Sequence, residues 1–109
     1  MDIINLTPHG VNIVCDGTIT VFAPSGQVAR CAQETARVGS ICAGGADVPI
    51  TRTRFGQVID LPEPTLGTLY IVSRIVLSAC PMRTDLVVPN ELVRDGAGNI
   101  VGCKSLAVN

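Results

Sequence analysis

The chain has 109 residues, of which 47% are hydrophobic and only 16% are charged, and its net charge is -1. This length predicts a single domain, residues 1–109, and the near-neutral charge excludes a general electrostatic attraction to nucleic acid or to an anionic membrane. Because so few charged residues leave little polar material to cover a monomer, we expect a homo-oligomer with an apolar interface.

The cysteines fit neither a zinc site nor a secreted disulfide framework, since they are odd in number, widely spaced and accompanied by one histidine. They are Cys15, Cys31, Cys42, Cys80 and Cys103. We interpret them as buried free thiols in a reducing cytoplasm. Residues 1–5 lack signal-peptide features, and the apolar run at about 70–80 is too short to span a bilayer. We therefore expect a cytoplasmic protein with no metal and no cofactor.

The first half of the chain predicts short strands separated by turns. Residues 3–6 form a first strand, and residues 11–22 form a β-hairpin around Asp16-Gly17, a strong two-residue turn. Further strands follow at 28–32 and from 33 onward, then a flexible glycine-containing loop at 43–47. Residues 48–59 read as one long strand or a bent pair, with Gly56 as a bulge.

The second half contains the only long apolar run, Gly67 to Pro81. Its β-branched and aromatic start predicts a buried strand over 68–72, which turns at Ser73 into a short helix at about 74–80 that Pro81 ends. An apolar segment at 85–88 ends at Pro89, and a hairpin follows over 92–106. The fold class is α+β: a β-rich, mostly antiparallel sheet or small barrel with one short helix.

Catalysis has little support in this sequence. His9 is the only histidine, so any Ser-His-Asp or Cys-His arrangement would need it, and no spacing identifies its partners. Nucleophile-elbow, P-loop and dinucleotide-binding glycine motifs are absent. We expect a non-enzymatic protein in which His9 lies in a turn, either bonded to nearby backbone or contributing to a binding site.

Anion recognition has better support. A strand that runs directly into a helix at Ser73-Arg74 leaves free N–H groups for a phosphate or carboxylate, although Ser73 would equally serve as a plain N-cap. Small-residue turns such as the one at Ser25 let backbone N–H groups approach a ligand closely. Exposed aromatic rings are too few for a single-stranded nucleic-acid platform, which leaves a small anionic ligand.

Seven of the eight basic residues are arginines, whose planar fork suits paired hydrogen bonds to phosphate. Arg52 and Arg54 lie two apart on a predicted strand and should project from one face. Arg74 and Arg83 flank the helix. Asp85 either pairs with Arg83 as a structural salt bridge or binds a ribose hydroxyl. Solvated surface arginines remain the alternative for each of them.

Several short motifs, taken together, resemble a family of small proteins from phages, prophages and bacterial genomes. The matching segments are Ile4 to His9, Pro24 to Gly26, Val28 to Arg30, Phe55 to Val58, Leu61 to Pro64, Tyr70 to Ser73, Arg83 with Asp85 and Leu86, Val93 to Asp95, and Ile100 to Gly102. They cover nearly the whole chain. Residues 40–47 form a longer joint than the resemblance leads us to expect.

The resemblance implies a small accessory protein of phage origin that acts in the host cytoplasm. Such proteins act by binding, either blocking a host defence protein or sequestering a nucleotide-derived immune signal. Combined with the arginines, it predicts a protein that sequesters a small phosphorylated nucleotide to counter host defence. A protein-binding inhibitor or interaction module, and a virion-associated structural protein, are the alternatives.

Overall fold

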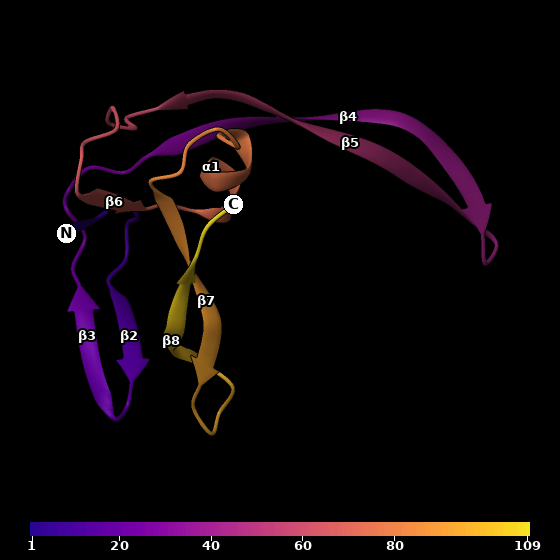
Figure 1. Ribbon diagram of the computed structural model, residues 1–109. Coiled ribbons are helices and arrows are strands. Elements are labelled where there is room, and N and C mark those ends of the chain that lie inside the picture. The colour runs from indigo at the N-terminus through magenta and orange to yellow at the C-terminus, as the bar shows by residue number, and fades with distance from the viewer.

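The computed structural model describes all 109 residues, and its strands form a curled six-stranded sheet and a separate two-stranded arm (Figure 1). Across the sheet the order is β1 (Asp2–Asn5), β6 (Thr68–Ile71), β7 (Leu86–Arg94), β8 (Ile100–Ala107), β2 (Val11–Cys15) and β3 (Thr18–Phe22). The arm consists of β4 (Arg30–Ala43) and β5 (Ala46–Ile59). The predicted β-rich fold with one short helix is confirmed.

Strand β6 lies at the centre of the hydrophobic core because both of its faces are buried. On one face, Tyr70 and the following Val72 pack with Leu86 and Val88 of β7 against Val76 of helix α1 (Arg74–Ala79). On the other face, Ile71 packs in a second cluster of buried side chains that includes Val11, Val87 and Cys103. The near-continuous apolar character of residues 69–72 follows from this two-sided burial.

The boundary between β6 and α1 lies where the sequence predicts it. Ser73 has extended backbone, and its Oγ accepts a hydrogen bond from the Val76 amide at 3.3 Å, which makes it the N-cap of the helix. The helix ends at Ala79, and Cys80, the residue before Pro81, is its C-cap. It places Val76 and Leu77 over one face of the sheet.

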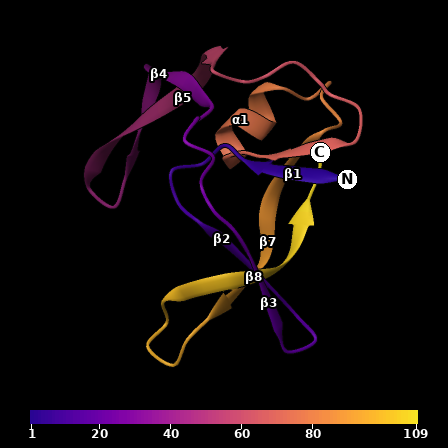
Figure 2. The ribbon, with the colours of Figure 1, turned by 90° about the vertical axis from the view of Figure 1, so that its left-hand side faces the viewer.

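The sheet is mixed, and two of its three parallel pairings, β1–β6 and β2–β8, join segments that are far apart in sequence. The hairpins β2–β3 and β7–β8 are antiparallel, whereas β1–β6, β6–β7 and β2–β8 are parallel. The sheet curls into a half-barrel, so that its two edge strands approach each other: Asn5 of β1 bridges Pro24, and its side chain reaches the Phe22 carbonyl. Figure 2 shows the two hairpins extending away from this region.

Two sequence predictions for the arm need correction. Residues 30–43 form one strand rather than two, and the predicted flexible loop at 43–47 is a tight turn in which Gly44 and Gly45 have φ values of 58° and 77°. Positive φ at both central residues is the geometry of the turn that matches the twist of a β-hairpin. The predicted bulge at Gly56 is confirmed, since the register shifts there, and a second shift occurs at Val38.

Strand β7 also runs further than predicted. The sequence suggests that the segment 85–88 ends at Pro89, yet the strand continues to Arg94. Strand β6 pairs with β7 only as far as Val87. Pro89 therefore has no strand beside it on the β6 side, and the N–H group that it lacks is not needed there for a ladder hydrogen bond.

The arm extends far beyond the rest of the molecule, which we call the body and which comprises all residues outside 30–59. The radius of gyration is 17.4 Å, compared with about 13 Å for a compact chain of about 100 residues. Only the base of the arm is covered, because Cys31 and Val58 pack against the core cluster under α1. No helix is both long enough and apolar enough to cross a membrane.

All five cysteines are free thiols, but their burial differs from the prediction. Cys103 is buried and Cys31 and Cys80 are partly buried, whereas Cys15 and Cys42 are exposed. Cys15 ends a hairpin strand and Cys42 lies next to the tip of the arm, and neither position has a core to enter.

Candidate functional site

The two residues at the start of α1 both have hydrogen-bond partners within the chain. The Ser73 hydroxyl caps the helix. Nη2 of Arg74 donates to the Pro89 carbonyl at 3.3 Å and to Oδ1 of Asn90 at 3.4 Å, so this guanidinium lies over β7. Both side chains are exposed, and these are long, weak hydrogen bonds that a ligand would readily replace.

Arg83 and Asp85 form a salt bridge in the loop between α1 and β7. Nε and Nη2 of Arg83 donate to the two carboxylate oxygens of Asp85, each at 2.8 Å, and Nη2 also donates to the Pro62 carbonyl at 3.0 Å. The paired hydrogen bonds from Arg83 lower the pKa of Asp85, and the same bonds raise the pKa of Arg83. Asp85 thus already neutralises the charge of Arg83. The bond from Arg83 to the Pro62 carbonyl holds this loop against the Pro62 segment.

Arg52 and Arg54 lie on the arm, on the same face of β5 as the sequence predicts. The register places Ala36 opposite Arg52 and Glu34 opposite Arg54. Both arginines are exposed, and neither forms an ion pair, since the two ion pairs of the chain are Arg37–Asp47 and Arg83–Asp85. These are the two predicted arginines whose guanidinium groups are free to bind a ligand.

Ser25 and His9 lie in exposed turns whose hydrogen bonds are local. The Ser25 hydroxyl bonds with the backbone of Gln27, and its amide donates to the Asn5 carbonyl at 3.0 Å. The His9 carbonyl accepts hydrogen bonds from the side chains of Asn5 and Thr7, at 2.8 and 2.9 Å. These contacts hold the backbone of both turns and use neither ring nitrogen of His9.

The structure thus groups the predicted residues into separate places rather than one site. Arg52 and Arg54 share the arm, Arg83 and Asp85 share a loop, and Ser73 and Arg74 share a helix start. No three His, Cys, Asp or Glu side chains gather in a way that would hold a metal ion.

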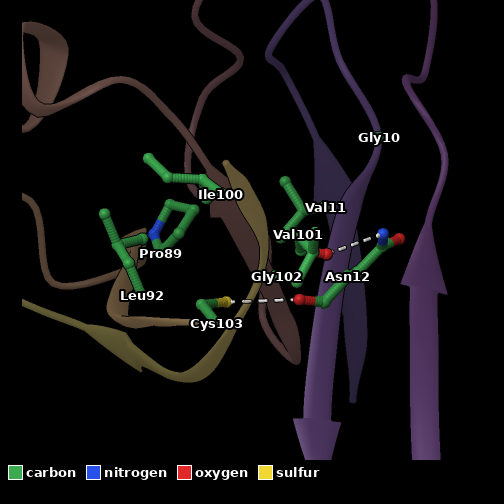
Figure 3. Close-up of a pocket in the computed structure, with 9 residues that line it drawn as sticks. All are labelled: Gly10, Val11, Asn12, Pro89, Leu92, Ile100, Val101, Gly102 and Cys103. Carbon is green, nitrogen blue, oxygen red and sulfur yellow. Dashed lines mark hydrogen bonds between the residues drawn. The ribbon is translucent and has the colours of Figure 1, made fainter. Parts of the chain in front are cut away.

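The body also has a hollow that the sequence did not indicate. It has a volume of about 260 Å³ and lies between β2 and the β7–β8 hairpin (Figure 3). We call it the groove; its lining residues are Gly10, Val11, Asn12, Pro89, Leu92, Ile100, Val101, Gly102 and Cys103. Asn12 bridges its two sides, donating to the Val101 carbonyl, while its own carbonyl lies 3.5 Å from Sγ of Cys103. The groove exists because β2 pairs in parallel with β8, and no local sequence pattern predicts this pairing.

Comparisons with protein family models, with curated proteins and with solved structures found no match. The function must therefore be inferred from the residues and geometry of this chain.

Proposed function

We propose that this protein is a phage-type accessory protein that binds and sequesters a small anionic, nucleotide-derived ligand to counter host defence. It acts in the host cytoplasm and by binding rather than catalysis. The observation that carries the proposal is the pair Arg52 and Arg54, two exposed guanidinium groups on one face of the arm that form no ion pair.

The spacing of this pair suits a ligand with more than one phosphate. Residues two apart on a strand are separated by roughly 6.6 Å along the chain, and each guanidinium presents a fork of donors that matches phosphate oxygens. Both forks project from the same side of the hairpin. A nucleotide with two phosphates, or with a phosphodiester on each side of a ring, would contact both at once.

The other predicted arginines support this role less directly. Arg83 is neutralised by Asp85, so recruiting it would cost the salt bridge. Arg74 is held by two hydrogen bonds to β7, both longer than 3.2 Å, and is a secondary contact at most. The primary ligand contacts are therefore assigned to the arm.

Isothermal titration with a panel of mononucleotides, nucleoside diphosphates and cyclic dinucleotides tests the proposal. We expect at least one to bind, and the double variant Arg52→Ala/Arg54→Ala to lose at least tenfold in affinity. Arg37→Ala is the matched control, because Arg37 is also an exposed arm arginine. It lies opposite Thr51 in the strand register, so its side chain is on the other face of the hairpin from Arg52. Unchanged affinity in the double variant, or an equal loss in the control, would refute the assignment.

A protein-binding role is the second candidate, and the exposed apolar side chains of the arm favour it. It covers both an inhibitor of a host protein and a virion-associated structural protein. Stoichiometric co-purification with one host protein would support the first, and co-purification with phage particles the second. In either case the double variant Val48→Asp/Ile50→Asp, which makes the arm polar, should abolish the association.

A further inference from the structure

The outer half of the arm is apolar and uncovered. Its exposed side chains, which we call the arm tip, are Val38, Ile41, Val48 and Ile50, with exposed fractions of 52%, 55%, 39% and 41%. Ile41 pairs directly with Val48, and Ile50 is two residues further along, so these three share one face of the hairpin. A two-stranded hairpin without a third layer is marginally stable in water. The arm tip therefore requires a partner surface.

The charges of the arm and of the body are complementary. The arm has four arginines and two acids, a net charge of +2, whereas the body has four basic and seven acidic residues, a net charge of −3. Three arm arginines have no acidic partner, namely Arg30, Arg52 and Arg54. Six body acids also have none, namely Asp2, Asp16, Asp60, Glu63, Glu91 and Asp95. A basic arm is thus attracted to an acidic body of the same sequence.

The groove is the apolar hollow of that acidic body. Leu92, Ile100 and Val101 line it and are 49%, 55% and 45% exposed. Its volume of about 260 Å³ exceeds the 150 Å³ or so of an engineered cavity that accepts benzene. One or two branched aliphatic side chains therefore fit inside, as the face formed by Ile41, Val48 and Ile50 would supply.

The arm does not reach the groove of its own chain. Figures 1 and 2 agree that the arm extends to one side of the body while the β2–β3 and β7–β8 hairpins extend in another direction.

We propose that the arm tip of one copy docks in the groove of a second copy, with Ile41, Val48 and Ile50 against Leu92, Ile100 and Val101. The partner is another copy of this chain because the same sequence carries both complementary surfaces. The inference does not depend on the nucleotide ligand. It gives the uncovered arm its missing third layer.

A complementation experiment tests the docking. The arm variant is Val48→Asp/Ile50→Asp and the groove variant is Leu92→Asp/Ile100→Asp; all four positions are exposed, so each variant should fold. Light scattering at micromolar concentration should show a multimer for the wild type and the monomer mass of 11.4 kDa for each variant alone. Mixing the two variants should restore a dimer, because the intact arm of one meets the intact groove of the other. Leu66→Asp, at a fully exposed apolar position outside both surfaces, is the control and should assemble like the wild type.

Other outcomes would overturn the inference. A monomeric wild type excludes self-association, a groove variant that still assembles shows that the arm docks elsewhere, and a mixture that stays monomeric excludes arm-to-groove complementation. If the aspartate variants prove unfolded by circular dichroism, the corresponding serine pairs are used with the same expected results. Nucleotide titration of Arg52→Ala/Arg54→Ala is read separately, so either proposal can fail while the other stands.

Discussion

Arg83 and Asp85 face each other through two parallel hydrogen bonds of 2.8 Å, with Arg83 also bonded to the Pro62 carbonyl. Their side chains are only 21% and 14% exposed, so water screens this pair less than it screens a surface ion pair. An arginine that the sequence offered as an anion ligand thus connects the proline-rich segment at 61–64 to the start of β7. Its role in the structure is to hold these segments together.

Replacing Arg83 should therefore affect stability rather than ligand binding. Arg83→Ala leaves the Asp85 carboxylate partly buried without its donor, which should lower the free energy of unfolding by about 1 to 3 kcal/mol. Urea denaturation measures this, with Arg94→Ala as a control because Arg94 is exposed and donates one bond, to Gly98. Loss of nucleotide binding at unchanged stability would show instead that Arg83 contacts the ligand.

The same pair predicts how stability depends on pH. Because Arg83 lowers the pKa of Asp85 in the folded state, the carboxylate stabilises the fold above its unfolded pKa, near 4. That stabilisation is lost as the pH falls through the lower folded pKa. Asp85→Asn should thus be less stable than the wild type at pH 7, and the difference should shrink below about pH 4. Urea unfolding between pH 7 and pH 2.5 tests this; a difference that stays constant contradicts it, and Asp16→Asn, in an exposed turn, should show no such convergence.

Asn5 should be one of the least replaceable polar residues. It is 2% exposed, its Nδ2 donates to the carbonyls of His9 and Phe22, and its Oδ1 accepts from the amide and hydroxyl of Thr7. Asn5→Ala removes all four bonds and should destabilise the protein by at least about 1 to 3 kcal/mol, the cost of one unsatisfied buried group. Thermal unfolding measures the loss. Asn12→Ala, which removes one solvent-exposed hydrogen bond of 3.3 Å, should cost clearly less.

Gly102 leaves little room for a side chain, because β8 approaches β2 closely there. A Cβ atom at Gly102 would lie 3.0 Å from the Asn12 carbonyl oxygen and 3.1 Å from Cγ2 of Val14. Gly102→Ala therefore forces the Asn12 backbone and the Val14 side chain to shift by a few tenths of an ångström where the two strands pair, and we expect a drop in thermal stability of several degrees. Gly96→Ala is the control, since nothing lies within 4 Å of its Cβ position. Equal stability of the two variants would contradict this account.

The sequence predicts the elements whose signals are local. The hairpin at 11–22 follows from alternating residues around Asp16-Gly17, and both its strands form as expected. The strand at 68–72 and the helix after Ser73 are also confirmed to within a residue or so. In each case a turn residue and an apolar pattern lie within a few positions of one another.

Local patterns of this kind could not predict the arm or the separation of the site residues. Residues 30–43 have no apolar alternation because this strand has no core to face. The sequence therefore contains no pattern from which the length of the strand could be predicted. The sequence identified each arginine as a candidate anion ligand, but the distances between these arginines depend on where the arm points. The groove likewise depends on β2 meeting β8, through Ile13 and Cys103, which are 90 positions apart.

The order of strands in the sheet also constrains how the chain folds during synthesis. Strand β8 follows all the other strands of the sheet in the sequence, yet it lies between β7 and β2 and is the only strand whose pairing connects the β2–β3 hairpin to the others. The β2–β3 hairpin is therefore synthesised long before the strand that pairs with it, and until then the contacts of Asn5 with Phe22 and Pro24 are its link to the rest of the sheet. Long-range closure of this kind is slow, and in the meantime the edges of β2 and of the emerging arm are open to mispairing with other nascent chains.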